Sequence, residues 1–248
     1  MHQYINDVIS QFYESDESGG LKCGLDPTRM DSKDLSDVQS RYHGFSYPGF
    51  ISPDIHTIWI DVNEPEENDG TSKVNIAEIE AIKKVLSLLN KAAGFNDFMA
   101  HWDYYADNDF RKKEEKEIGI ISFYGKQVKK MQESVRPVAR ELSIPIRLKT
   151  VDKFQGMERN IIIVSTVRSN KNKKLNGFIA TNNDAGFAKS PERLNVALSR
   201  ARRLLIVVGN KSFFSGIKDN EGKYLYRNAI NEIEKNGLVI DYNDLKKL

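Results

Sequence analysis

Short runs of almost continuous apolar residues recur along the chain after residue 56 and are separated by segments of a different period. Strands that are buried on both faces of a parallel sheet have this uninterrupted apolar character. The pattern predicts strands at 57–62, 118–123, 147–151, 160–167 and 203–209, with a short last strand at 238–241.

Between these runs, apolar residues step by three and four positions, which is the period of a helix with one buried face. This spacing predicts helices at 75–91, 127–141, 190–201 and 225–236. Asn75, with Glu78 three residues later, predicts a capped start for the first of them. Ser190 followed by Pro191 marks the start of the third in the same way.

Strands that alternate with helices form a doubly wound α/β domain with a mostly parallel sheet flanked by helices. In such sheets functional groups lie on loops at the carboxyl ends of the strands. That rule directs attention to the segments that follow Phe123, Val151, Val167 and Gly209.

The first 55 residues differ from the rest of the chain. Residues 2–13 have helical apolar spacing, whereas residues 14–52 are rich in Ser, Asp, Gly and Pro and show little periodicity. We expect a single domain over 1–248, with a loop-rich N-terminal excursion at 1–55 and the α/β core at 56–248.

Composition excludes several classes of protein. No apolar run approaches the roughly 20 residues that a membrane-spanning helix needs, and the N-terminus lacks the features of a secretory signal. Cys23 is the only cysteine, so it forms no internal disulfide. The four histidines lack metal-ligand spacing, and we expect no metal site. These features favour a cytoplasmic protein without a membrane partner.

The net charge of +2 says little about partners, but charge is unevenly distributed. Residues 61–69 hold five acids and no base, and residues 168–176 hold four bases and no acid. A basic loop can contact phosphate groups, although a solvated surface is the commoner reason for one charge run.

Neither of the common phosphate-binding loops is present. The pattern G-x-x-x-x-G-K-[ST] does not occur, since Gly125-Lys126 is followed by Gln127 and Gly222-Lys223 by Tyr224. There is no G-x-G-x-x-G turn either. The chain therefore has no evident loop with which to hold a triphosphate and Mg²⁺ alone.

Two stretches are much more specific, namely TVDKFQGMERN at 150–160 and RLNVALSRAR at 193–202. A helix through the second would bury one face, and would place Arg193 and Arg200 within about 20° of each other on its flank. Spacing alone leaves two uses for Arg200 equally open, a phosphate contact or an ion pair with a surface carboxylate. The buried face would consist of Leu194, Ala197, Leu198 and Ala201.

These two stretches resemble the fifth and sixth helicase motifs of superfamily 1, in the branch of the nonsense-mediated-decay helicase and senataxin. IGIISFYGKQ at 118–127 resembles the fourth motif, and Met1-His2 with the following helix is similar to the family's Tyr-Arg-Met-His-Pro segment. The resemblance extends from Met1 to about Phe214. It implies a RecA-like, P-loop NTPase-type fold, and the second such domain of a two-domain motor.

The resemblance also implies roles for individual residues. Arg200 matches the arginine finger that reaches the γ-phosphate across the domain cleft, and Glu158, beside Gly156, matches the glutamate that binds the nucleotide ribose. Ser122 and Thr150 match positions whose hydroxyls contact the nucleic-acid backbone. ATP and Mg²⁺ would be bound mainly by a first RecA-like domain. That domain and single-stranded DNA or RNA would be the partners.

The sequence departs from the family at three positions, with Gln3 and Phe123 in place of proline and Ser199 in place of threonine. The family's Tyr-Arg pair would lie immediately before Met1. We therefore expect either a truncated form of a longer helicase or a natural short protein, and little or no ATP hydrolysis by this chain alone.

Two other functions remain open. The chain could be a non-catalytic, degenerate RecA-like module that binds nucleic acid or a protein. It could also be a nuclease, because Glu221-Gly222-Lys223 fits the E-x-K fragment of metal-dependent nucleases, although three residues match by chance too often to carry weight.

Overall fold

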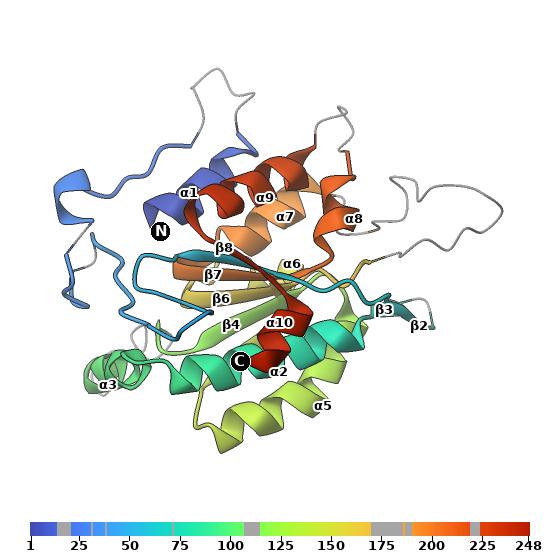
Figure 1. Cartoon of the computed structure of the whole chain (residues 1–248), viewed down its shortest axis with the longest axis horizontal. Helices are drawn as coiled ribbons and strands as arrows, with labels where there is room; N and C mark the ends of the chain where they lie inside the picture. The colour runs from blue at the N-terminus through green and yellow to red at the C-terminus, as the bar shows by residue number, and fades with distance from the viewer. Residues whose placement is uncertain are drawn as a thin grey trace.

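A computed structural model of the chain describes residues 1–13, 21–30, 32–37, 39–70, 72–106, 115–169, 186, 190–218 and 224–248. A six-stranded sheet lies between two layers of helices (Figure 1). The strands follow the spatial order β5-β4-β6-β7-β1-β8, and every neighbouring pair is parallel. Their bounds are β1 Thr57–Asp61, β4 Ile118–Ser122, β5 Ile146–Thr150, β6 Arg159–Ser165, β7 Ala201–Gly209 and β8 Leu238–Asp241.

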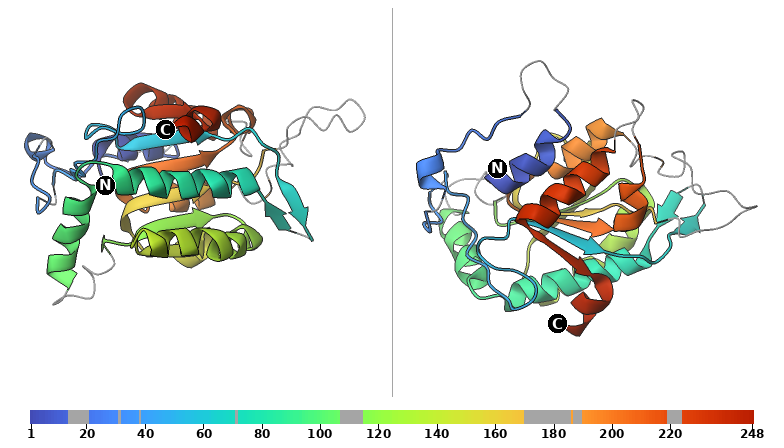
Figure 2. Two further views of the ribbon diagram at one scale, coloured as in Figure 1. Left: turned by 60° about the horizontal axis from the view of Figure 1, so that its bottom comes forward. Right: turned by 45° about the horizontal axis from the view of Figure 1, so that its top comes forward.

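Alternate residues of each central strand enter two different hydrophobic cores, as the period of a strand requires. In β1, Ile58 and Ile60 pack into one core and Trp59 into the other. The first core lies against α2 (Ile76–Lys91), α3 (Phe95–Ala106), α5 (Gly125–Glu141) and α10 (Tyr242–Lys247). The second lies against α1 (Gln3–Ser10), α6 (Val151–Phe154), α7 (Pro191–Leu198), α8 (Lys211–Ser215) and α9 (Leu225–Asn236). Figure 2 shows both layers from two further directions.

The structure confirms the predicted α/β class and the parallel sheet. Asn75 caps α2 as expected, since its side chain accepts a hydrogen bond from the Glu78 amide. Several elements were not predicted. These are α3, α6, α8, α10 and the hairpin of β2 (Glu67–Asp69) and β3 (Ser72–Val74). Most are too short to show a clear period, and the hairpin is formed by polar residues except for the buried Val74.

The predicted helix at 190–201 is too long by three residues. Helix α7 ends at Leu198, Ser199 and Arg200 form a turn, and Ala201 is the first residue of β7. The chain leaves the helix there because Ala201 pairs with Arg159 in the sheet. Arg200 therefore extends from a turn and not from a helix flank, although the four predicted apolar residues are all buried.

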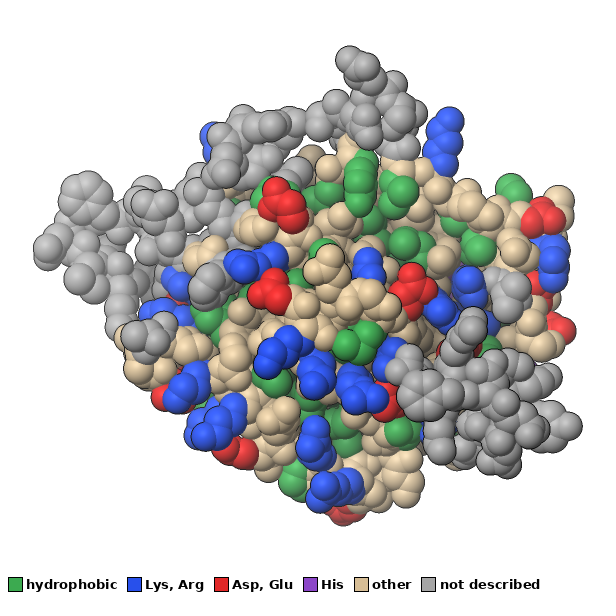
Figure 3. Space-filling model, turned by 180° about the vertical axis from the view of Figure 1, so that it is seen from behind, with side chains coloured by type: hydrophobic (Ala, Val, Ile, Leu, Met, Phe, Trp, Pro, Cys, Tyr) green, Lys and Arg blue, Asp and Glu red, His purple; other side chains and the backbone are tan. Residues whose placement is uncertain are grey.

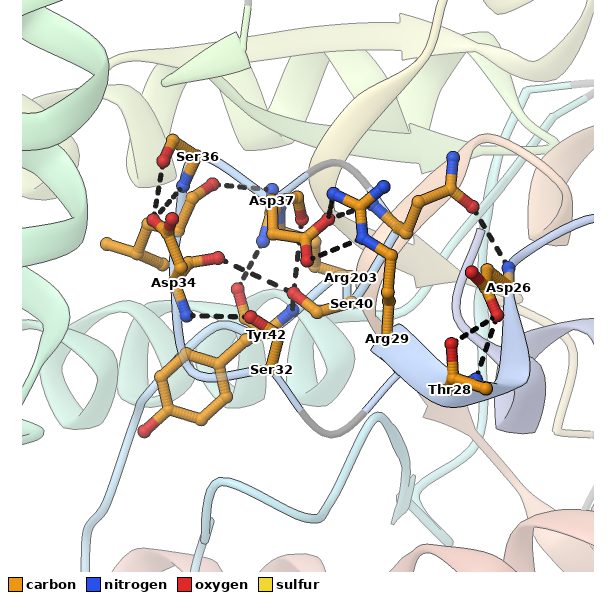
Figure 4. Close-up of polar contacts among 12 residues, drawn as sticks. Asp26, Thr28, Arg29, Ser32, Asp34, Ser36, Asp37, Ser40, Tyr42 and Arg203 are labelled. Atoms are coloured by element: carbon orange, nitrogen blue, oxygen red, sulfur yellow. Dashed lines mark hydrogen bonds and ion pairs between the residues drawn. The ribbon is translucent and has the colours of Figure 1, made fainter.

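The described part of the N-terminal excursion has little regular structure beyond helix α1. After helix α1, the described part contains one 3-10 turn, η1 (Pro27–Arg29), and isolated bridges near residues 46–51. Aspartate side chains accept hydrogen bonds from amides two residues ahead, at Asp26, Asp34 and Asp37 (Figure 4). Such local bonds fold a segment without helix or strand.

Arg203 of β7 attaches this excursion to the core. Its guanidinium is completely buried and donates to the carbonyl oxygens of Tyr42 and Leu35 and to the Asn160 side chain. Figure 4 shows Arg203 beside this loop. Because these bonds satisfy the donors of a buried guanidinium, they hold the excursion against β7.

Candidate functional site

The predicted site residues lie at two opposite edges of the sheet. Ser122 and Thr150 are paired at the carboxyl ends of the neighbouring strands β4 and β5. Glu158 and Arg200 immediately precede β6 and β7, so they lie at the amino ends. The two edges are about 20 Å apart along a seven-residue strand. Of the two groups of predicted residues, only Ser122 and Thr150 therefore lie at the carboxyl ends of the strands.

At the amino-end edge, Arg200 has no carboxylate within 4.0 Å in the part of the chain that the structure describes. Its guanidinium instead donates to the carbonyl oxygen of Val196 at 3.1 Å and to the Ser199 hydroxyl at 2.7 Å. Its neighbours are ion-paired, since Arg193 lies 3.2 Å from Asp152 and Arg202 lies 2.8 Å from Glu115. Of the two uses left open for Arg200, the carboxylate pair is not formed among the described residues.

Glu158 and Gly156 lie on the same edge. The Glu158 side chain is half exposed and accepts a hydrogen bond from Arg202 Nε at 3.0 Å. Gly156 has a φ of +80°, which favours glycine, and a Cβ placed there would meet no atom within 4 Å. The positive φ of the backbone therefore requires glycine here, since a side chain would meet no steric clash.

The segment that resembles Tyr-Arg-Met-His-Pro also lies at this edge. The His2 amide donates to the Arg202 carbonyl oxygen at 2.8 Å. Burial and the nearby Arg41 lower the pKa of the Met1 amino group. The fold thus brings the first residues of the chain against Arg202 at the start of β7, 200 positions later.

At the carboxyl-end edge, the two predicted hydroxyls differ in accessibility. Ser122 is completely buried, and its oxygen lies 3.5 Å from the Tyr124 amide that donates to it. Thr150 is half-buried and precedes α6 without a side-chain hydrogen bond to that helix. Only Thr150 therefore presents part of its side chain at the surface.

A buried polar network behind this edge was missed from the sequence. Glu78 accepts hydrogen bonds from the Ser165 hydroxyl at 2.6 Å and from the Val167 amide at 2.8 Å. Gln127 donates to Ser165 and accepts from the Asn75 amide. Burial raises the pKa of Glu78 to about 8. The spacing of Asn75 and Glu78 suggested a local cap, whereas the Glu78 side chain bonds the end of β6.

Arg168 and Ser169, the described part of the basic segment, contact the acidic segment at the same edge. Arg168 forms an ion pair with Glu66 at 3.1 Å, and both side chains are almost fully buried. The Ser169 amide also donates to Glu66. Arg168 is therefore a structural residue and not part of a solvated basic loop. Lys171, Lys173 and Lys174 lie outside the described residues, as do Glu221 and Lys223.

Three of the histidines form a cluster that the sequence did not predict. The rings of His2 and His56 stack with centroids 3.4 Å apart, and His43 meets His56 edge-on at 4.7 Å. Burial lowers the pKa of His2 to about 3 and that of His56 to about 4, and takes the pKa of His43 well below its ordinary value. The three rings are neutral at physiological pH, and those of His2 and His56 border a cavity of about 480 Å³.

Within the described ranges, no group of three or more His, Cys, Asp or Glu side chains could hold a metal ion. No helix in those same ranges is long and apolar enough to span a bilayer.

Comparison with known proteins gives a family match and named relatives. The AAA domain family matches residues 1–212. The chain is 47% identical over 107 residues to the protein named as helicase MOV-10 of Gallus gallus, and 42% identical over 97 residues to the DNA polymerase alpha-associated DNA helicase A of Saccharomyces cerevisiae. It is 26% identical over 235 residues to the helicase required for RNAi-mediated heterochromatin assembly 1 of Schizosaccharomyces pombe.

These alignments cover 40%, 39% and 94% of this chain. They cover only 10%, 12% and 18% of the respective relatives. The chain therefore matches less than a fifth of the length of each of these proteins.

Proposed function

Because the chain belongs to the AAA domain family, in the superfamily 1 helicase branch of the nonsense-mediated-decay helicase and senataxin, we propose that it is the second RecA-like domain of a helicase motor. In this role it supplies an arginine finger and part of the track for single-stranded DNA or RNA. It needs a first RecA-like domain for ATP hydrolysis.

The unpaired guanidinium of Arg200 is the main support for this proposal. Of the other arginines in and next to the sixth motif, Arg193 and Arg202 are ion-paired with carboxylates, and Arg203, one residue beyond the motif, is buried in the fold. Arg200 bonds only its own turn in the described part of the chain, so little is lost if it turns toward an anion. An arginine is suited to this task because its charge is fixed and its donors are planar.

The residues at the amino-end edge fit a nucleotide that is held mainly by another domain. An unpaired guanidinium suits a phosphate group, and the half-exposed Glu158 carboxylate can accept hydrogen bonds from ribose hydroxyls. ATP with Mg²⁺ is the cofactor used by helicases of this family, and it supplies the phosphoryl group whose transfer drives the motor. Arg200 would neutralise the charge that develops on that group.

The separation of the two edges suggests a division of tasks within the domain. Arg200 and Glu158 would face the nucleotide at the amino ends of the strands, and Thr150 would contact the strand at the carboxyl ends. Hydroxyl contacts to a nucleic-acid backbone position it without reading its sequence. The sheet itself connects the two edges, since β6 is hydrogen-bonded to β4 and β7.

The test uses a protein that carries both motor domains and compares Arg200→Ala with Arg193→Ala. Arg193 is a matched control because it lies two turns away and already has the carboxylate partner Asp152. We expect Arg200→Ala to lower kcat for ATP by about 10³-fold or more, with single-strand binding retained. Arg193→Ala should stay close to wild type.

Two results would contradict the proposal. One is Arg200-dependent ATP hydrolysis by the 248-residue chain alone. The other is ATP turnover by Arg200→Ala at the rate of Arg193→Ala, which would favour the non-catalytic module. Thermal unfolding of both variants separates loss of chemistry from loss of the fold.

A further inference from the structure

Positive charge is concentrated in one contiguous part of the chain. Residues 125–154, which form α5, β5 and α6, contain eight Lys and Arg against three Asp and Glu. The other 218 residues contain 29 basic and 32 acidic residues. The small net positive charge of the protein therefore arises entirely from this segment.

The basic side chains lie on both sides of an edge strand. Strand β5 is the outermost strand of the sheet, next to β4. On helix α5, Lys129, Arg136 and Arg140 are spaced by seven and four residues, so they share one stripe on the helix surface. This stripe lies opposite the buried face of α5, which includes Met131 and Val135.

Strand β5 carries further basic residues on its other face. Leu148 is buried against the α5 side of the sheet, so Arg147 and Lys149 project from the opposite side. Lys153 follows one turn later in α6 and is exposed. Seen from behind, Lys and Arg side chains gather over the lower half of the molecule, at the height of α5 (Figure 3).

Some of these charges are neutralised by neighbouring acids and others are not. Lys126, Lys130 and Arg147 lie within 4.0 Å of Asp69, Glu133 and Glu117 respectively. Five others have no carboxylate within 4.0 Å among the described residues, and we name them the basic rim: Lys129, Arg136, Arg140, Lys149 and Lys153. Such neighbouring like charges repel one another, so they do not stabilise the fold, and together they attract an anionic partner.

The basic rim is continuous with the carboxyl-end edge of the sheet. Thr150 directly follows Lys149 and lies three residues before Lys153. We propose that the basic rim binds the phosphate backbone of single-stranded nucleic acid that continues from Thr150 around strand β5 and along α5. The stripe on α5 is about 16 Å long, which is enough for several phosphates. This inference rests on the proposed function, in which Thr150 contacts the strand.

Two alternative roles, protection of the sheet edge and attachment to a membrane, explain this charge pattern less completely than nucleic-acid binding does. Lysines protect an edge strand from pairing with another chain, but that role covers Lys149 and not the stripe on α5. An anionic membrane surface is usually bound with the help of exposed apolar side chains. Among the described residues the large exposed apolar side chains are Leu21 and Ile76, and neither belongs to residues 125–154.

The test measures binding of the 248-residue chain to fluorescent oligo-dT and oligo-U of about 6 and about 20 nucleotides. The rim variant is Lys129→Gln with Arg136→Gln and Arg140→Gln, which keeps Lys149 on the edge strand. The matched control is Lys22→Gln with Lys91→Gln and Lys246→Gln, because these lysines are exposed, lie outside residues 125–154 and change the net charge equally when replaced.

We expect the rim variant to bind the longer oligonucleotide about tenfold or more weakly, and the shorter one within about twofold of wild type. The slope of log affinity against log salt should fall by about 2, since each lost contact to a single strand contributes about 0.7. The control should match wild type. Equal affinities of rim variant and control for the longer oligonucleotide would overturn the proposal, as would rim-dependent binding to phosphatidylserine vesicles without oligonucleotide binding.

A Thr150→Ala variant separates this inference from the proposed function. If Thr150→Ala binds both lengths normally while the rim variant loses the longer one, the rim is a binding surface and the assigned track at Thr150 is wrong. If Thr150→Ala weakens binding of both oligonucleotides and the rim variant weakens binding of neither, Thr150 contacts the strand and the basic rim is not a binding surface.

Discussion

The carboxyl group of Glu78 on α2 accepts a 2.6 Å hydrogen bond from the hydroxyl of Ser165, the last residue of β6. Both side chains are completely buried. The same carboxyl group holds the amide of Val167, whose φ of 72° is rare for a β-branched residue. A buried acid thus fixes the backbone where β6 leaves the sheet, close to the edge that carries Thr150.

This network predicts a pH dependence that Glu78→Gln removes. The pKa of Glu78 is raised to about 8 by burial, from an ordinary value of 4.5, so the folded chain holds a proton that the unfolded chain has lost between these values. The stabilisation that the protonated Glu78 side chain provides is complete below pH 4.5. As the pH rises from 4.5 to about 8, this part of the free energy of unfolding falls by about 1.4 kcal/mol per pH unit. Glutamine keeps the shape and cannot ionise.

Urea unfolding of wild type and Glu78→Gln at about pH 6.5 and about pH 8 measures this difference. Other titrating groups are common to both proteins and cancel in the comparison. We expect the free energy of unfolding to fall more for wild type than for the variant over this range. An equal fall of the free energy of unfolding in both proteins would show that Glu78 is already ionised in the folded protein.

The buried histidines predict the opposite behaviour in acid. Burial lowers the pKa of His2 to about 3 and that of His56 to about 4. Below pH 6.5 the unfolded chain therefore binds protons at these histidines, whereas the folded chain does not. Stability should therefore fall as pH decreases from 6.5 to about 4. NMR titration of the ring protons should show no protonation of either histidine above about pH 5, and a midpoint near the ordinary value of about 6.5 would contradict the cluster.

Arg203 and Arg202 are adjacent in sequence and should differ sharply on substitution. Arg203→Ala leaves the carbonyl oxygens of Tyr42 and Leu35 without a donor, at a cost of roughly 3 kcal/mol or more. Arg202→Ala removes ion pairs that are partly solvated, which costs at most about 1 kcal/mol. Urea unfolding measures both values.

Limited proteolysis gives a second measurement of the role of Arg203. Loss of this residue should expose the excursion around residues 26–42 to cleavage before the core unfolds, while Arg202→Ala should be cut like wild type. Equal protease resistance of the two variants would mean that the local aspartate bonds alone hold the excursion.

The two predicted hydroxyl contacts should also separate. Thr150→Ala removes a half-exposed hydroxyl and should weaken single-strand binding several-fold, whereas Thr150→Ser should retain it. Ser122→Ala changes a completely buried side chain and should leave binding within about twofold of wild type. Fluorescence anisotropy with oligo-dT measures both, and a larger loss for Ser122→Ala would reverse the assignment.

Much of the fold could be predicted because its signals are local. The apolar runs that form β4, β6 and β7 reflect burial on both faces, and the period of α2 reflects burial on one face. The ends of elements were less predictable, as with α7, whose last turn is replaced by strand pairing of Ala201. The short polar hairpin of β2 and β3 has no such signal, since its residues bury little apolar surface.

The sequence by itself determined the strands of the main sheet, helices α1, α2, α5, α7 and α9, the helicase motifs and the absence of the two common phosphate-binding loop patterns, because each depends on residues that are close in the chain. Only the tertiary structure decided which charged side chains form ion pairs or are buried and which stay without a charged partner among the described residues. It paired Glu66 with Arg168, buried Arg203 and left Arg200 without a carboxylate among the described residues. It also placed Thr150 and Arg200 at opposite edges of one sheet. Such partners come from segments far apart in sequence, and their proximity exists only once the parallel strands have set the order and direction of the chain.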